Sequence, residues 1–208
     1  MNIKDKNIII NRYRSRLQEH GHSIQALASG TIERRDIRFD VLNSVGDLQG
    51  KRVLDIGCGL ADFYAWLGER GIRVNYTGYD ITPELVEFSE ARFPDANFEV
   101  RDIQTQGIPE NFDYIVSSQT FNNKLTYHDN YEVMKDVLKI CYEASNQAVA
   151  VDMMTTYVDF RDSHLFYYNP EVIFQYAKSI TKRVLLRHDY PAYEFAVFLY
   201  KDFDGWKK

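Results

Sequence analysis

The sequence is poor in cysteine, in long apolar runs and in excess positive charge, and each shortage excludes a class of protein. Only two cysteines, Cys58 and Cys141, occur in 208 residues, so neither a disulfide scaffold nor a zinc site is indicated. The apolar stretch from Ile8 to Ile10 is too short for a signal-peptide core or a membrane span, and charged residues follow it in NRYRSR. We therefore expect a cytoplasmic protein that has no membrane partner and keeps both thiols reduced.

The charge balance argues against nucleic acid as a partner. The chain has 25 lysine and arginine residues against 30 aspartate and glutamate residues, which gives a net charge of −5 at pH 7. A polyphosphate would be repelled unless basic residues were segregated on one surface, and the sequence shows no such patch. The lack of Gly-Lys-Ser and Gly-Lys-Thr excludes a P-loop, and no tight cluster of acids indicates a metal site.

The order of apolar and helical segments predicts one α/β core. From residue 51 onward, short apolar runs typical of buried strands alternate with segments of helical spacing. Thr82 followed by Pro83 predicts the N-cap and first residue of one helix, and Gly71 the end of another. Two strand segments flank YPAY near the end, which is typical of an antiparallel hairpin. The expected strands cover residues 51–57, 74–80, 97–102, 112–118, 147–154, 183–189 and 194–202.

The predicted fold class is therefore a Rossmann-like, seven-stranded, mostly parallel sheet with helices on both faces and an antiparallel C-terminal hairpin. Residues 1–50 stand outside the alternating pattern. They are expected to form a helical appendage over the top of the sheet, with a break at LASGT. The main domain is expected to cover residues 51–208.

The stretch VLDIGCGLADF places a carboxylate and two glycines at the end of the first expected strand. Ligands of such sheets bind at the carboxyl ends of strands, where Gly57 and Gly59 would let the backbone approach a ligand closely. Asp55 could orient this turn or meet an ammonium group. Asp80 ends the second strand, where a carboxylate can accept hydrogen bonds from ribose hydroxyls, and Asp102 ends the third. Each acid alone could be a helix cap or a solvated loop residue, but together they favour a nucleoside site.

A dinucleotide cofactor is the main competing interpretation, because it also needs a glycine-rich turn and a later acid. Its fingerprint has glycine or alanine at the sixth position, where this chain has Asp62. A carboxylate there would repel a diphosphate at the helix N-terminus, so a nicotinamide or flavin enzyme is disfavoured.

These motifs resemble those of the class I S-adenosylmethionine-dependent methyltransferases. VLDIGCGLA is similar to the first motif of that family, YTGYDITPELVEFSEARFPDANFEVRDI to the second and third, and FDYIVSSQTF to the fourth, over about residues 51–152. Ala61 stands where the family often has a third glycine, and we expect only a slight adjustment of the loop. The resemblance implies S-adenosyl-L-methionine as the cofactor and S-adenosyl-L-homocysteine as the product.

The resemblance also implies how individual residues would hold the cofactor. The backbone of the first turn would approach the methionyl part, and Asp80 would hold the ribose. Ile81 would pack on the adenine, while Asp102 and the backbone of Ile103 would read the adenine edge. The N-terminal region would close over the cofactor. The implied cofactor-binding residues are Asp55, Gly57, Cys58, Gly59, Asp80, Ile81, Asp102, Ile103, Ser117 and Ser118, with Tyr13, Gly30 and Arg38 as secondary contacts, although Arg38 could equally be a solvated helix residue.

Methyl transfer depends on alignment of the acceptor more than on any covalent residue. A hydroxyl acceptor would need a base, and histidine suits that role near neutral pH. His128, His164 and His188 follow or precede strand ends and are the candidate bases, although a structural role is an alternative for each. Arg161 could equally anchor an anionic acceptor.

The expected activity is methyl transfer to a small molecule, on oxygen. The loop SSQTFNNK lacks the Asn-Pro-Pro-aromatic or Asp-Pro-Pro-aromatic arrangement of the exocyclic amino methyltransferases, which disfavours methylation of nucleic-acid bases. A protein side chain as acceptor, and a catalytically inactive cofactor-binding partner subunit, are the alternatives.

Overall fold

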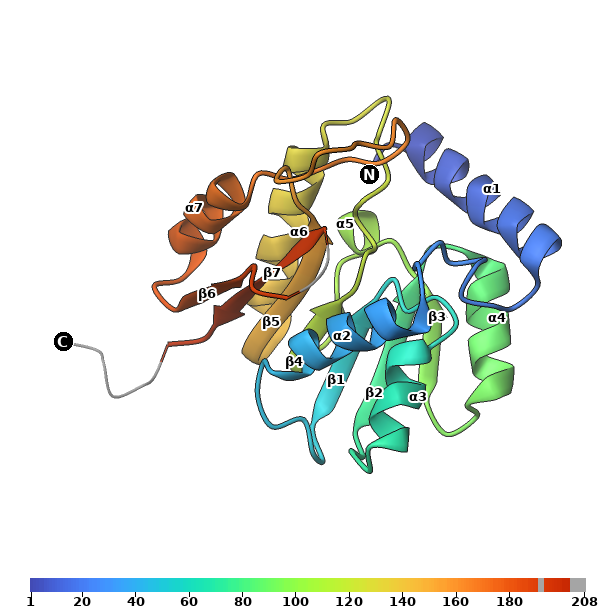
Figure 1. Cartoon of the computed structure of the whole chain (residues 1–208). Coiled ribbons are helices and arrows are strands. Elements are labelled where there is room, and N and C mark those ends of the chain that lie inside the picture. The colour runs from blue at the N-terminus through green and yellow to red at the C-terminus, as the bar shows by residue number, and fades with distance from the viewer. Residues whose placement is uncertain (191–192, 203–208) are drawn as a thin grey trace.

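A seven-stranded sheet forms the centre of the computed structural model, which describes residues 1–190 and 193–202 (Figure 1). The strand order is β3-β2-β1-β4-β5-β7-β6. Strands β1 to β5 pair in parallel, and β7 is antiparallel to both β5 and β6. The predicted mostly parallel sheet with an antiparallel hairpin is therefore confirmed, although residues 191–192 of the predicted YPAY turn lie outside the described residues.

The strands are β1 (Arg52–Ile56), β2 (Asn75–Asp80), β3 (Asn97–Val100), β4 (Phe112–Ser117), β5 (Ser145–Met154), β6 (Val184–Arg187) and β7 (Glu194–Tyr200). The helices are α1 (Ile3–His20), α2 (Ile32–Asn43), α3 (Asp62–Glu69), α4 (Pro83–Arg92), α5 (Ile103–Gln106), α6 (Asn130–Ala144) and α7 (Pro170–Ile180).

Both faces of the sheet are covered, which is why its central strands read as continuous apolar runs. In β5, Ala148 and Ala150 belong to the core cluster on the face of α2 and α3, whereas Val149 and Val151 belong to the cluster on the face of α6 and α7. All four side chains are buried. The alternation follows from the two-residue period of a strand.

The first fifty residues do not form one layer. Helix α1 lies across the edge where the parallel strands end (Figure 1), and Asp5 is its only fully buried residue. Helix α2 instead packs on the sheet and buries Phe39 and Leu42 in the core. Among the described helices, none has the length and apolar character needed to cross a membrane.

Local signals placed most helix ends correctly. Pro83 is the first residue of α4, and Gly71 follows α3 with a left-handed φ of +74°. Thr82 occupies the N-cap position as predicted, but its fully buried side chain makes no capping hydrogen bond. The single-turn helix α5 was not predicted. It begins after Asp102, whose carboxylate accepts a hydrogen bond from the backbone of Gln104.

Candidate functional site

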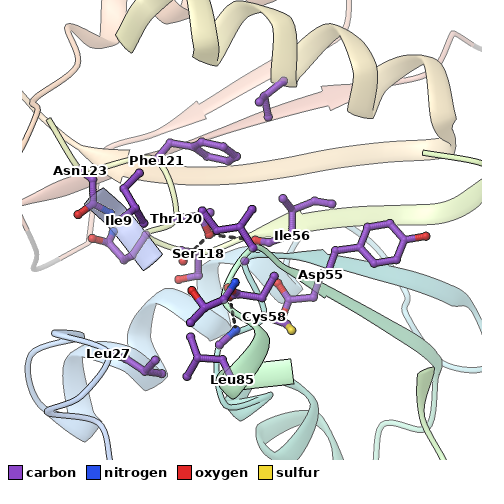
Figure 2. Close-up of a pocket in the computed structure, with 18 of the residues that line it drawn as sticks. Ile9, Leu27, Asp55, Ile56, Cys58, Leu85, Ser118, Thr120, Phe121 and Asn123 are labelled. Atoms are coloured by element: carbon purple, nitrogen blue, oxygen red, sulfur yellow. Dashed lines mark hydrogen bonds between the residues drawn. The ribbon is translucent and has the colours of Figure 1, made fainter. Parts of the chain in front are cut away.

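A cavity lies at the carboxyl ends of β1 and β2, with α1 forming part of its wall (Figure 2). Asp55, Asp80 and Asp102 all line it, so the structure brings the three predicted carboxylates to one cavity. Ser117 is not part of its lining, and Gly30 lines a neighbouring cavity instead. The other predicted cofactor residues that line it are Tyr13, Arg38, Gly57, Cys58, Gly59, Ile81, Ile103 and Ser118.

The turn after β1 has a conformation that favours glycine. Gly57 and Gly59 have φ angles of +72° and +56°, a region that residues with a side chain disfavour. A Cβ atom on Gly57 would lie 2.2 Å from Thr120 Oγ1, and one on Gly59 would lie 3.2 Å from Leu27 Cδ1. Ala61 is also left-handed, with φ +58°, so alanine tolerates the position where the family often has glycine. The turn thus presents backbone rather than side chains to the cavity.

Asp80 is held firmly at the cavity wall. Its Oδ2 accepts a hydrogen bond from Gly59 N at 3.1 Å, and its Oδ1 accepts one from Thr82 N at 2.8 Å. Burial raises the pKa of this carboxyl group, and the backbone N–H donors oppose the rise. Because each carboxylate oxygen has two lone pairs, acceptor capacity remains for the hydroxyl groups of a ligand.

Asp102 connects the sheet edge to α1. It is 4% exposed, and one oxygen caps α5. The other oxygen lies 3.6 Å from Lys6 Nζ. The acid predicted to read an adenine edge is therefore paired with a lysine of the helix that crosses the cavity.

Asp55 is a buried acid of the site with a strongly raised pKa. It is 4% exposed, and its Oδ2 accepts a hydrogen bond of 2.7 Å from the Tyr76 hydroxyl. Burial raises the pKa of Asp55 from 3.8 to about 7, although the Tyr76 hydrogen bond lowers it and the charge of Asp80 adds to the rise. Near neutral pH this residue can hold or release a proton.

Hydrogen bonds and an ion pair connect helix α1 to segments around the cavity. Asp5 is 2% exposed and accepts hydrogen bonds from the backbone N–H groups of Thr126 and Tyr127, at 2.8 and 3.1 Å. Arg14 forms an ion pair with Glu84 of α4. These contacts place Tyr13 in the wall of the cavity.

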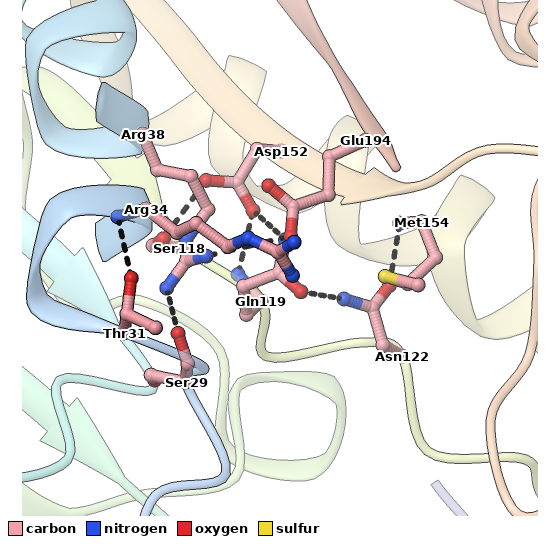
Figure 3. A network of polar contacts seen from close by, with 10 residues as sticks. All are labelled: Ser29, Thr31, Arg34, Arg38, Ser118, Gln119, Asn122, Asp152, Met154 and Glu194. Carbon is pink, nitrogen blue, oxygen red and sulfur yellow. Dashed lines mark hydrogen bonds and ion pairs between the residues drawn. The ribbon is translucent and has the colours of Figure 1, made fainter. Parts of the chain in front are cut away.

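Arg38 is buried, so the alternative of a solvated helix residue is wrong. It is 3% exposed, its Nη1 lies 3.4 Å from Glu194 Oε1, and its Nη2 donates a hydrogen bond to Ser29 O at 2.8 Å (Figure 3). Burial raises the pKa of Asp152, and the charge of Arg38 opposes that rise. One cation therefore faces two acids, Asp152 and Glu194, from β5 and β7.

Asp152 also holds the loop after β4 in place. Asp152 accepts hydrogen bonds from Ser118 Oγ at 2.8 Å and from the backbone N of Gln119 at 2.7 Å (Figure 3). Gln119 has a left-handed φ of +59°, a conformation that this double attachment holds in place. Ser117 Oγ donates to Ile56 O at 2.8 Å, which makes it a link between strands. Sequence reasoning missed Asp152 and Gln119, although an acid within the apolar run QAVAVDMM was a usable signal.

A second cavity adjoins the first and shares walls with it. Tyr13, Arg38, Gln119 and Asn123 line both. Among the residues that line only the second cavity is His164. Several arginine side chains that are distant in the sequence also line this cavity. The structure therefore has a local basic patch that the sequence did not reveal.

The three candidate histidines have different surroundings. His164 lies in the wall of the second cavity, and its Nδ1 is 3.0 Å from Asp162 Oδ1. His128 and His188 are exposed and line neither cavity. Arg161, the suggested anion anchor, also lines neither, and it donates a hydrogen bond to a backbone carbonyl. Within residues 1–190 and 193–202, no group of three or more His, Cys, Asp and Glu residues could hold a metal ion. Cys58 and Cys141 are both buried and free.

Comparison with known proteins identifies related chains. Residues 47–155 match a family model described as a methyltransferase domain. A putative methyltransferase of Mycobacterium tuberculosis is 33% identical over 159 residues, which span 71% of this chain and 91% of that protein.

Solved structures with a similar fold are also found. A magnesium protoporphyrin IX methyltransferase from Synechocystis PCC 6803 superposes with a TM-score of 0.68 at 14% identity, covering 95% of this chain and 97% of the other. An S-adenosylmethionine-dependent methyltransferase from Archaeoglobus fulgidus gives a TM-score of 0.62 at 16% identity, covering 83% and 95%. These structures share the sheet and its helices.

Proposed function

This chain belongs to the class I S-adenosylmethionine-dependent methyltransferases, and we propose that it methylates an oxygen of a small-molecule acceptor. The observation that carries the assignment of the cofactor site is the placement of Asp55, Asp80 and Asp102 around one cavity beside a glycine turn. The Synechocystis protein of similar fold is named for a small molecule, magnesium protoporphyrin IX, which supports an acceptor of that class.

The residues around the first cavity fit S-adenosylmethionine. Gly57 and Gly59 have no side chain, so the methionyl part can approach the backbone there. Asp80 keeps lone pairs that can accept hydrogen bonds from the ribose hydroxyls. Asp102 and Ile103 line the same cavity, which supports their proposed role at the adenine edge. When bound, the cofactor supplies a methyl group made electrophilic by the adjacent sulfonium. Tyr13 and α1 would cover it and exclude water.

The acceptor would enter through the second cavity. That cavity meets the first at Tyr13, Gln119 and Asn123, so a molecule bound there could place one atom beside the methyl group. Alignment of the two reactants is the main contribution expected of the protein. His164, oriented by Asp162, is the histidine best placed to take a proton from a hydroxyl acceptor.

Replacement of Asp80 tests the cofactor site. Asp80→Ala is expected to weaken S-adenosylhomocysteine binding by about 1 to 3 kcal/mol, because groups of the cofactor would be left without an acceptor. Titration calorimetry measures the affinity, and Asp80→Asn, which keeps one acceptor oxygen for the loop, provides a variant with smaller structural risk. Exposed Asp159, which lines neither cavity, serves as the matched control through Asp159→Ala. Unchanged affinity in folded Asp80→Ala would refute the assigned role.

The class of acceptor is tested with a radioactive methyl group on the cofactor. Incubation with metabolite extracts and with protein extracts should place the label in the small-molecule fraction. Label that stays with macromolecules would identify a protein acceptor. A chain that binds the cofactor but forms no S-adenosylhomocysteine with either extract would instead be the catalytically inactive partner subunit.

A further inference from the structure

The second cavity carries an unusual concentration of arginine for a chain of net charge −5. Arg12 and Arg16 come from α1, and Arg34 and Arg38 come from α2. Glu194 is the only carboxylate among the described residues that line this cavity. Four guanidinium groups therefore face one acid.

That acid is already engaged. Glu194 pairs with buried Arg38; burial raises the pKa of Glu194 to about 7, and the charges of Arg38 and Arg34 oppose that rise. Asp152 lies behind Arg38 and adds a second negative charge outside the cavity lining. The guanidinium group of Arg34 lies 5.4 Å from the centre of the Tyr193 ring, a contact that orients the cation without neutralising it.

Among the described residues, Arg12 and Arg16 of α1 have only neutral hydrogen-bond partners. Arg12 Nη1 donates to the amide oxygen of Asn123 at 2.7 Å. Arg16 donates to the backbone carbonyl groups of Gln25 and Ala26. Their positive charge is therefore available to a ligand, and the part of the lining that α1 contributes is cationic as well.

We infer that the second cavity binds an oxyanion, a carboxylate or a phosphate group, of the methyl acceptor, with Arg12 and Arg34 as its ligands. The inference rests on the proposed function, because it defines the substrate class of the same site. A planar guanidinium group donates two parallel hydrogen bonds to either anion. An anion in this cavity could therefore accept hydrogen bonds from arginines of both α1 and α2.

The positions of these arginines also orient the acceptor. Arg12 and Arg34 line only the second cavity, whereas Tyr13, Gln119 and Asn123 line both. An acceptor held by its anionic end at the arginines would present its opposite end to the shared wall. The reacting atom and the anionic group thus belong to different ends of the molecule.

Anion binding is tested directly on the full chain saturated with S-adenosylhomocysteine. Inorganic phosphate and benzoate are titrated in separate arms, and the arginine Nε–Hε signals of labelled protein are followed by nuclear magnetic resonance. At least one anion should bind saturably, and Arg12→Gln and Arg34→Gln should each weaken it about tenfold, as expected for loss of a charge-assisted bond. The tighter arm distinguishes phosphate from carboxylate recognition. Arg52→Gln, at the opposite end of β1 in a surface pair with Glu110, is the matched control and should bind the anion normally.

The affinity for S-adenosylhomocysteine separates this inference from the proposed function. Arg12 and Arg34 do not line the first cavity, so both variants should keep that affinity, which also shows that they are folded. Intact cofactor binding without saturable anion binding, or equal anion affinity in all three variants, would overturn the inference alone. Failure of the unsubstituted chain to bind S-adenosylhomocysteine would overturn the proposed function.

Discussion

Replacing Arg38 with methionine should lower the free energy of unfolding by about 3 to 5 kcal/mol, the usual cost of removing one partner from a buried ion pair. The side chain is 3% exposed and faces Glu194 at 3.4 Å. Burial raises the pKa of Asp152, and the charge of Arg38 also opposes that rise. Methionine preserves much of the volume but removes the cation that Asp152 and Glu194 share, and leaves Glu194 only the charge of Arg34. Urea unfolding followed by circular dichroism measures the loss.

The loss should depend on pH with a definite sign. Burial raises the pKa of Glu194 to about 7 even with Arg38 present, so the folded chain binds this proton more tightly than the unfolded chain. The contribution of Glu194 to stability is therefore greatest below its unfolded pKa of about 4.5 and falls as pH rises towards 7. Without Arg38, both acids should resist ionisation further. The variant should thus be most destabilised at pH 8 and least at pH 4, where the acids are neutral.

Two controls make this result specific. Arg52→Met removes a surface pair with Glu110 and should change stability by less than about 1 kcal/mol. Glu194→Gln in the Arg38→Met background should recover part of the loss, which a double-mutant cycle quantifies. An equal loss at pH 4 and pH 8 would show that Arg38 acts through packing and not through its charge.

The parts of the fold that the sequence predicted are those encoded by neighbouring residues. The glycine turn after β1 and the acids at the ends of β1 and β2 were predicted because a strand end and its following turn are continuous in sequence. The same holds for Pro83 at the start of α4. Family resemblance then connected these local motifs with one cofactor.

The polar cluster behind the second cavity could not be predicted in this way. The cluster joins three distant segments, which contribute Arg38, Asp152 and Glu194. Glu194 lies beside the end of β5 because β7 pairs antiparallel with β5 in a register that sets Glu194 opposite Met154. The insertion of β7 between β5 and β6 is a property of the whole sheet. No local pattern reports which helix of the first fifty residues packs on the sheet, and so the arginines of α1 and α2 could not be assigned to one cavity.

Asp55→Asn should increase stability at pH 8 by about 2 to 4 kcal/mol and leave it nearly unchanged at pH 4, an estimate that follows from proton linkage. The pKa of Asp55 is raised from 3.8 to about 7 in the folded chain. Between these values the unfolded chain releases the proton and the folded chain retains it, so ionisation costs stability as pH rises. Asparagine cannot ionise, and its amide oxygen can still accept the 2.7 Å hydrogen bond from Tyr76. Urea unfolding at pH 4, 6 and 8 measures the difference, with Asp159→Asn as the exposed control.

A gain in stability from this single substitution would bear on function. Asp55 lines the cofactor cavity, and a buried carboxylate that destabilises the fold near neutral pH is typical of a binding group under a stability–activity trade-off. If Asp55 meets the ammonium group of the cofactor, Asp55→Asn should bind S-adenosylhomocysteine more weakly at pH 8 while unfolding at higher urea concentration. Higher stability together with weaker cofactor affinity would indicate a binding role. If Asp55 only orients the turn, Asp55→Asn should lower both the stability and the affinity.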